Sequence, residues 1–161
     1  MADGQLLAAI DIGSNSFRLE IGRLDNGQIV RAEYLKETVR LGAGLDESSR
    51  LSSQSMRRGW DCLARFAERV RGFEPRRVRA VATQTVREAR NRAEFEAGAQ
   101  ARLGFPIDVI SGHEEARLIY SGVAQFLSAG DESRRVFDIG GRSTEVILGR
   151  GREPQRRASY R

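Results

Sequence analysis

A strand–turn–strand pattern occurs twice in this chain and limits its possible folds more than any other feature. The first copy reads AIDIGSNSFRLEIG (Ala9–Gly22), and the second reads VFDIGGRSTEVILG (Val136–Gly149). In each copy an apolar segment ends in Asp-Ile-Gly, small polar residues follow, and a second apolar segment leaves. One such turn is ordinary loop chemistry, because Asp, Gly, Asn and Ser are the common turn residues. Two turns with the same entry indicate a duplicated structural unit.

The residue types in both turns suit a phosphate group and a metal ion. Glycine and other small residues let backbone N–H groups converge on an anion. Hydroxyl and amide side chains add hydrogen-bond donors, and a carboxylate at a strand end suits a magnesium ion held directly or through water. The candidate donors are Ser14, Asn15, Ser16, Ser143 and Thr144, and the candidate carboxylates are Asp11 and Asp138.

The spacing of apolar residues predicts an α/β fold. Strands are expected at 6–12, 17–24, 28–39, 78–83 and 107–110, and helices from 52 or 53, within TQTVREARN, from a cap at Asn91 to about 103, and from Ser111 to about 127. Ser111 and Glu114 have the capping-box spacing. The order β-β-β-α-β-α-β-α is that of an RNase H-like domain, and the second copy of the repeat follows it as a further hairpin.

Composition limits the function classes and the compartment. The chain has 161 residues, of which 40% are hydrophobic, and no segment reaches the roughly 18 apolar residues of a membrane span. The N-terminus lacks the pattern of a signal peptide. Cys62 is the one cysteine, which excludes an internal disulfide framework and indicates a reducing, cytoplasmic environment. We interpret it as a packing residue, and we expect His113, the one histidine, to be exposed in a first helical turn.

The net charge of +5 comes almost entirely from arginine, since Lys36 is the one lysine. A positive field favours polyanionic partners such as nucleotides, polyphosphate or nucleic acid. No motif for specific nucleic-acid recognition is present, and the absence of a G-K-[ST] sequence excludes a P-loop nucleotide-binding site.

Longer strings of the sequence resemble one known family. DIGSNSFRL, SGHEEARLIYSGV and DIGGRSTEVILG, in this order and at these separations, are similar to the exopolyphosphatase / guanosine pentaphosphate phosphohydrolase (Ppx/GppA) family. GAGLDESSRLS and ATQTVREARN match its connecting segments, so that the resemblance covers about residues 6–149. It implies an RNase H-like lobe of the actin, Hsp70 and sugar-kinase superfamily. It further implies removal of a terminal phosphate from polyphosphate or pppGpp with Mg²⁺ or another divalent cation, and a homodimer for the full-length protein.

The resemblance also implies residue roles. Glu115, the second glutamate of EEAR, would orient and deprotonate the attacking water. The implied phosphate-binding residues are Gly13, Ser14, Asn15, Ser16, Arg87, Gly140, Gly141, Ser143 and Thr144, and the implied metal-binding residues are Asp11, Asp138 and Glu145. The residues alone leave a plainer alternative, in which Glu115 is a first-turn acid that complements the helix dipole and Arg87 is a solvated surface residue.

The resemblance predicts a complete first lobe at 1–127, including a hinge helix, and the start of a truncated second lobe at 128–161. The family usually reads DIGGGSTE, and Arg142 replaces the third glycine; it either adds a phosphate contact or blocks the turn. Two other functions remain open: a sugar-kinase-like phosphotransferase, and a non-catalytic module that binds polyphosphate or (p)ppGpp.

We expect Asp11 and Asp138 to approach one another if the C-terminal hairpin packs as in the family. Taken as an isolated hairpin, residues 136–148 predict a segment that is disordered, packs in a non-family position, or is covered by another copy of the chain.

Overall fold

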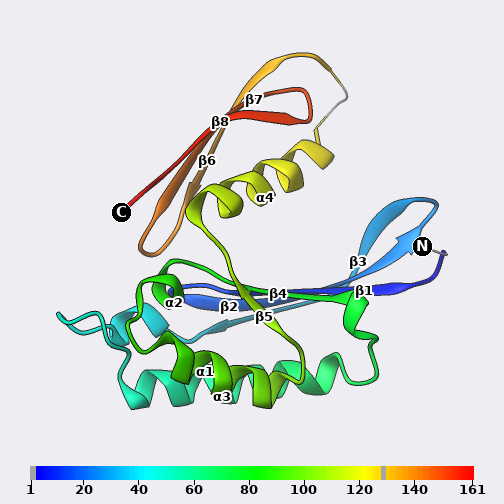
Figure 1. The fold of residues 1–161 in the computed structure, drawn as a ribbon. Helices are drawn as coiled ribbons and strands as arrows, with labels where there is room; N and C mark the ends of the chain where they lie inside the picture. The colour runs from blue at the N-terminus through cyan, green and yellow to red at the C-terminus, as the bar shows by residue number, and fades with distance from the viewer. Residues whose placement is uncertain (1–2, 128–129) are drawn as a thin grey trace. The chain divides into compact units, whose positions relative to one another are not determined.

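The computed structural model describes residues 3–127 and 130–161 and divides the chain into two compact units, Met1–Val109 and Ile110–Arg161 (Figure 1). The predicted boundary at 127 therefore differs from the observed division. The helix that we expected to complete the first lobe groups with the C-terminal strands.

The first unit contains a mixed five-stranded sheet with the order β3-β2-β1-β4-β5. The strands are β1 (Leu6–Ile12), β2 (Ser16–Asp25), β3 (Gln28–Thr38), β4 (Val78–Ala82) and β5 (Ile107–Val109). The first three form an antiparallel meander, whereas β4 runs parallel to β1 and β5 runs parallel to β4. This topology confirms the predicted RNase H-like order, because the parallel strands are joined through helices.

Two helices cover one face of this sheet, α1 (Ser53–Arg69) and α3 (Arg92–Leu103) (Figure 1). Helix α1 begins where the sequence predicts, since the Ser52 side chain accepts a hydrogen bond from the Ser55 backbone N–H. Asn91 is the N-cap residue of α3, as predicted, but its side chain makes no capping hydrogen bond and instead binds both backbone polar groups of Leu51. Shorter segments connect these elements: the 3₁₀ turns Leu41–Gly44 and Pro75–Arg77, and α2 (Gln84–Glu88).

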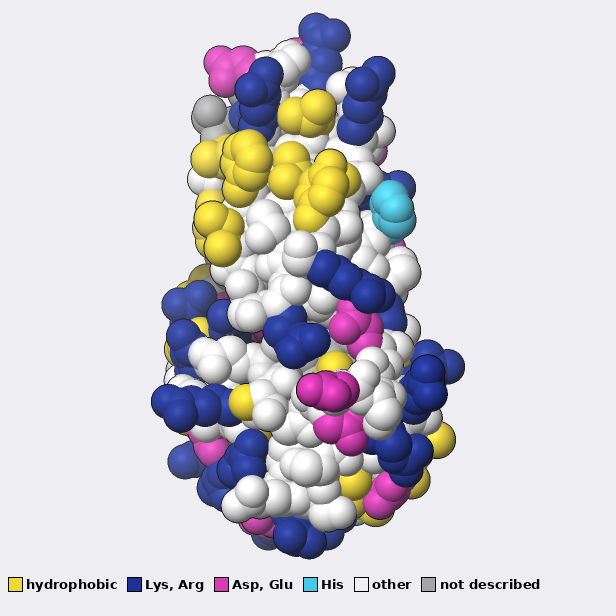
Figure 2. All heavy atoms as spheres, turned by 90° about the vertical axis from the view of Figure 1, so that its left-hand side faces the viewer, with side chains coloured by type: hydrophobic (Ala, Val, Ile, Leu, Met, Phe, Trp, Pro, Cys, Tyr) yellow, Lys and Arg dark blue, Asp and Glu magenta, His cyan; other side chains and the backbone are white. Residues whose placement is uncertain are grey.

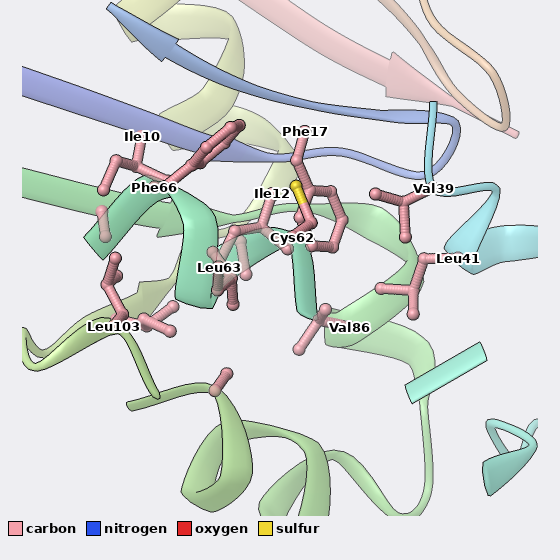
Figure 3. Close-up of a cluster of buried hydrophobic side chains, with 14 of the residues drawn as sticks. Ile10, Ile12, Phe17, Val39, Leu41, Cys62, Leu63, Phe66, Val86 and Leu103 are labelled. Atoms are coloured by element: carbon pink, nitrogen blue, oxygen red, sulfur yellow. The ribbon is translucent and has the colours of Figure 1, made fainter. Parts of the chain in front are cut away.

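The core of the first unit lies between these helices and the sheet (Figure 3). Ile10, Ile12 and Phe17 point from the sheet toward Leu63 and Phe66 of α1. Burying one such side chain stabilises the fold by about 1.5–3 kcal/mol. Cys62 is fully buried in this core, as predicted, and burial raises the pKa of its thiol to about 12.

The second unit contains α4 (Gly112–Gln125) and a three-stranded antiparallel sheet of β6 (Ser133–Ile139), β7 (Thr144–Arg150) and β8 (Glu153–Tyr160). Helix α4 covers one sheet face with Ala116, Tyr120 and Ala124, which pack against Ile147 of β7. The ring of Tyr120 lies so close to Gly149 that a Cβ there would approach it within 2.2 Å, and its hydroxyl donates to the Gly151 carbonyl (3.1 Å).

The prediction of an isolated hairpin at 136–148 is therefore wrong. The basic segment after Gly149 forms β8 and pairs with β7 along its length. Three strands under an amphipathic helix bury enough apolar surface to stabilise a hairpin that would be marginal alone. Among the described residues, no helix is long and apolar enough to cross a membrane.

Candidate phosphate-binding site

The two repeated turns have the same register. In the β1–β2 hairpin Ile12 pairs with Phe17, and in the β6–β7 hairpin Ile139 pairs with Thr144, so that four residues lie between each pair. The aspartate of each Asp-Ile-Gly stands one position earlier, at the end of its entry strand. The duplication inferred from the sequence therefore extends to the backbone pairing.

Each turn begins with a glycine, because a backbone carbonyl three residues later lies close to the position of its Cβ. A Cβ on Gly13 would lie 2.8 Å from the Ser16 carbonyl oxygen, and a Cβ on Gly140 would lie 3.0 Å from that of Ser143. At Gly13 a Cβ would force the backbone to shift, and at Gly140 the neighbouring carbonyl would have to move by a few tenths of an ångström. The second turn is also closed by a hydrogen bond from Gly140 N–H to the Ser143 carbonyl (2.8 Å). Both turns therefore favour glycine at this position, Gly13 more strictly than Gly140.

The first turn is held in place by the segment that follows β3. The Asn15 carbonyl accepts hydrogen bonds from the backbone N–H groups of Val39 (3.0 Å) and Arg40 (2.8 Å), and the Ser14 carbonyl accepts one from Gly42 (2.8 Å). In a trans peptide unit, C=O and N–H point in opposite directions. The N–H groups of Asn15 and Ser16 therefore point away from this segment, as a backbone anion site requires.

Helix α2 lies beside the first turn. Because β1 and β4 are parallel and Ile12 is aligned with Ala82, the segments that follow both strands lie at the same sheet edge. The Thr85 hydroxyl of α2 donates to Ser14 Oγ at 2.7 Å. Half-buried Arg87 is two residues further along α2. The first unit thus brings Asp11, the turn 13–16 and the helix that carries Arg87 to one edge.

The two aspartates differ in what stands opposite them. Asp11 faces Arg18 across the strands, and their side chains form an ion pair at 3.0 Å. Asp138 faces Glu145 at the equivalent position. Glu145 is buried, with 1% of its surface exposed, and it accepts a hydrogen bond from the Ser159 hydroxyl (2.8 Å). The second turn therefore places two carboxylates on the same face of the sheet.

Glu115 occupies the first turn of α4, as predicted. The Ser111 side chain caps the helix by accepting from Glu114 N–H (3.2 Å), and the Glu114 carboxylate forms a two-pronged ion pair with Arg117. Glu115 lies four residues before Ile119, which packs against the α4–β7 cluster, so it borders the sheet-facing side of the helix.

The start of α4 lies toward the same end of the second unit as Glu145. Tyr120 lies over Gly149. Four helical residues span about 6 Å, nearly the same as two strand residues. Ala116 and Ile147 belong to the same buried cluster as Tyr120, and Figure 1 shows the start of α4 toward the end of this unit that carries the β6–β7 turn. The second unit thus brings Glu115, Asp138 and Glu145 toward the end that carries the turn 140–143.

Asp138 and Glu145 supply two of the oxygen ligands that a magnesium ion would need. Mg²⁺ prefers oxygen ligands and is commonly bound through one or two carboxylates, water and substrate phosphates. Within the described ranges, no group of three or more His, Cys, Asp or Glu side chains is close enough to hold a metal ion by itself. Asp11 fits less well, because its carboxylate already binds Arg18. The metal roles of these residues, and the approach of Asp11 to Asp138, stay predictions.

Three contacts in this region were missed by sequence reasoning: those of Gly42, Thr85 and Ser159. Each joins a turn to a segment distant in the sequence. Thr85 and Gly42 lie in the connecting segments ATQTVREARN and GAGLDESSRLS, so the family resemblance was the one available signal for them. No sequence signal pointed to Ser159, because β8 was not predicted.

The mixed sheet, its helices and the repeated Asp-Gly turns define an RNase H-like lobe. A sequence profile of the Ppx/GppA phosphatase family matches residues 21–161. The chain belongs to this family. This confirms the resemblance read from the motifs and gives no support to a sugar-kinase-like phosphotransferase.

Relatives and solved structures agree with this assignment. The chain is 52% identical over 148 residues to the guanosine-5'-triphosphate,3'-diphosphate pyrophosphatase of Vibrio cholerae serotype O1, covering 92% of this chain and 30% of that protein. An exopolyphosphatase from Cytophaga hutchinsonii has a TM-score of 0.90 at 29% identity, over 97% of this chain and 50% of that one. The Aquifex aeolicus Ppx/GppA family member has a TM-score of 0.84 at 31% identity, over 96% and 50%. The chain thus spans 30% of the length of its curated relative.

Proposed function

We propose that this chain carries phosphate-binding and catalytic residues of a phosphohydrolase that removes terminal phosphate from polyphosphate, from pppGpp, or from both. The observation that carries the proposal is the pair of Asp-Ile-Gly turns. They have the same strand register, and each begins with a glycine whose Cβ position is crowded by a backbone carbonyl oxygen. Turns of this shape suit phosphate oxygens, which accept hydrogen bonds from converging backbone N–H groups. Relatives named for both substrates support the reaction class.

The proposal gives each candidate residue a role. The turns 13–16 and 140–144 bind phosphate oxygens through N–H and hydroxyl groups, and Arg87 adds positive charge beside the first turn. Glu115 orients the attacking water and accepts its proton, a function that contributes about 10²–10⁴-fold to a rate. Asp138 and Glu145 would hold a divalent cation, which when bound neutralises charge on the transferred phosphoryl group. A cytoplasmic location and a homodimeric full-length protein complete the proposal.

Phosphate release tests this proposal. The chain, and separately the full-length protein that contains it, are incubated with long-chain polyphosphate or with pppGpp, with and without Mg²⁺. We expect Glu115→Gln to lower turnover of the full-length protein about 10²-fold or more and to leave substrate binding nearly unchanged. Glu114→Gln is the matched control, because its carboxylate is held by Arg117 in the same helical turn.

Equal turnover for the two variants would remove Glu115 from the mechanism. Binding without phosphate release by the full-length protein would favour the other open function, a non-catalytic module for phosphate-rich ligands.

A further inference from the structure

A hydrogen bond between two hydroxyl groups joins helix α2 to the first turn. The Thr85 hydroxyl donates to Ser14 Oγ at 2.7 Å, although the two residues are 71 positions apart in the sequence. Thr85 is 1% exposed, and a hydroxyl so deeply buried needs a hydrogen-bond partner within the protein. Ser14 is that partner, so the bond fixes the Ser14 hydroxyl oxygen as an acceptor.

The surroundings of α2 hold Thr85 in this position. Thr83, the residue before the helix, donates its backbone N–H to the carbonyl of Ile12 at the end of β1 (3.3 Å). Val86, the residue after Thr85, is fully buried in the core of the first unit. The Thr85 hydroxyl is therefore anchored to the same strand end that leads into the turn.

These contacts use the acceptors of Ser14 and leave its donors for a ligand. The Ser14 carbonyl accepts from the Gly42 N–H (2.8 Å), and its hydroxyl oxygen accepts from Thr85. In the part of the chain that the structure describes, neither the N–H nor the O–H of Ser14 donates to another residue. Ser14 is half-buried, so it can be reached from outside. Phosphate oxygens accept hydrogen bonds, and an ionised acceptor makes such bonds stronger.

The second turn has no equivalent hydroxyl pair. The shared register makes Gly141 the counterpart of Ser14, and glycine has no side chain to orient. The pair is therefore a property of the first turn, and a substitution at Thr85 changes the donors of that turn alone.

We propose that Thr85 is a positioning residue, which orients the Ser14 hydroxyl so that its proton is donated to a phosphate oxygen. This inference rests on the proposed function. Without the Thr85 hydroxyl, the Ser14 side chain could occupy any of three staggered rotamers, and binding would have to select one of them. Accepting a hydrogen bond also polarises the Ser14 O–H, which strengthens the bond that this group donates.

Titration calorimetry with inorganic tripolyphosphate in Mg²⁺ tests this inference on the parent chain and its variants. Thr85→Val keeps the size of the side chain and removes the hydroxyl, and we expect it to weaken binding about three- to tenfold. Thr85→Ser is the matched control, because it keeps the hydroxyl, and it should bind within about twofold of the parent chain. Melting temperatures of both variants show whether the fold is kept.

A double-mutant cycle with Ser14 separates positioning from a structural effect. Ser14→Ala should weaken tripolyphosphate binding about tenfold. Adding Thr85→Val to Ser14→Ala should change binding less than about twofold, because no hydroxyl is left to orient. A displacement of α2, which also carries Arg87, would instead weaken binding by the same factor with or without Ser14.

Three outcomes would overturn the inference, and they separate it from the proposed function. If Thr85→Val binds tripolyphosphate as well as the parent chain does while Gly13→Ala weakens it, Thr85 positions nothing and the proposed function survives. Equal losses from Thr85→Val in the two backgrounds, or no recovery in Thr85→Ser, would assign Thr85 a structural role. Failure of the parent chain to bind tripolyphosphate would count against the proposed function, and this inference would fall with it.

Discussion

Asp138 lies directly opposite Glu145 in the β6–β7 ladder, at the position where Arg18 neutralises Asp11 in the other copy of the repeat. Like charges directly opposite one another destabilise a sheet by roughly 0.2–1 kcal/mol. A divalent cation bound by both carboxylates would reverse this effect. The pair therefore connects the stability of the second unit to metal binding.

We expect Mg²⁺ to raise the melting temperature of the parent chain, because the ion binds the folded state. Asp138→Asn should melt higher than the parent chain in EDTA and should lose most of the Mg²⁺-dependent increase. Asp108→Asn, which removes an exposed carboxylate paired with Arg79 in the first unit, should retain the full increase. A parent chain that is indifferent to Mg²⁺ would argue against a metal at this pair.

Gly13→Ala and Gly140→Ala should each lower the free energy of unfolding by about 1–3 kcal/mol, since the added Cβ forces the turn backbone to move. Urea denaturation measures this, and binding of tripolyphosphate should weaken in parallel. Gly122→Ala in α4 provides the control, because nothing lies within 4 Å of the added Cβ and alanine favours a helix by up to about 1 kcal/mol. The hypothesis of shape-constrained turns fails if all three substitutions behave alike.

A chain that ends at Val109 should fold cooperatively, because the first unit has its own core of strands, α1 and α3. A chain that ends at 133 should be less soluble and should bind hydrophobic dyes, since it exposes Ala116, Tyr120 and Ala124 of α4. The sequence alone predicts a boundary at 127, which assigns α4 to the first unit. Solubility and thermal melting of the two truncated chains distinguish these boundaries, and a well-behaved 1–133 chain would restore the earlier one.

The sheet face opposite α4 should promote self-association of this chain. Phe137 and Ile139 are 61% and 82% exposed there, whereas their counterparts in the first repeat, Ile10 and Ile12, are buried under α1 and α3. Figure 2 shows exposed hydrophobic side chains in yellow on the second unit, which can be found by the cyan side chain of His113. Replacing Phe137 and Ile139 by threonine should shift the sedimentation profile toward monomer. Replacement of Ile29 and Val30, exposed at the far edge of the first sheet, is the comparison that should leave it unchanged.

The Cys62 thiol should resist iodoacetamide at pH 8 in the folded chain and react readily in urea, because its pKa of about 12 leaves little thiolate. The folded pKa exceeds the ordinary value of 9.0. The thiol therefore contributes stability that is fully present below pH 9 and is lost as the pH rises toward 12. Cys62→Ala should show a shallower alkaline decline in stability. Rapid labelling of the native chain would contradict this burial.

Local patterns determined most of the first unit and the identity of the candidate residues. Alternating apolar residues around Leu19 and the Ser52 cap act over short distances, so they could be read directly. The repeated Asp-Ile-Gly strings located both turns and, with the family resemblance, Glu115.

Tertiary packing decided the rest, because those features depend on partners that are distant in the sequence. Strand β8 carries polar and basic residues and forms because β7 offers it a ladder, which no pattern within 153–160 announces. Helix α4 groups with the C-terminal sheet because Tyr120 finds a complementary surface at Gly149. Likewise, Asp11 and Asp138 look alike in sequence, and only the strand register gives one an arginine and the other a glutamate as its neighbour.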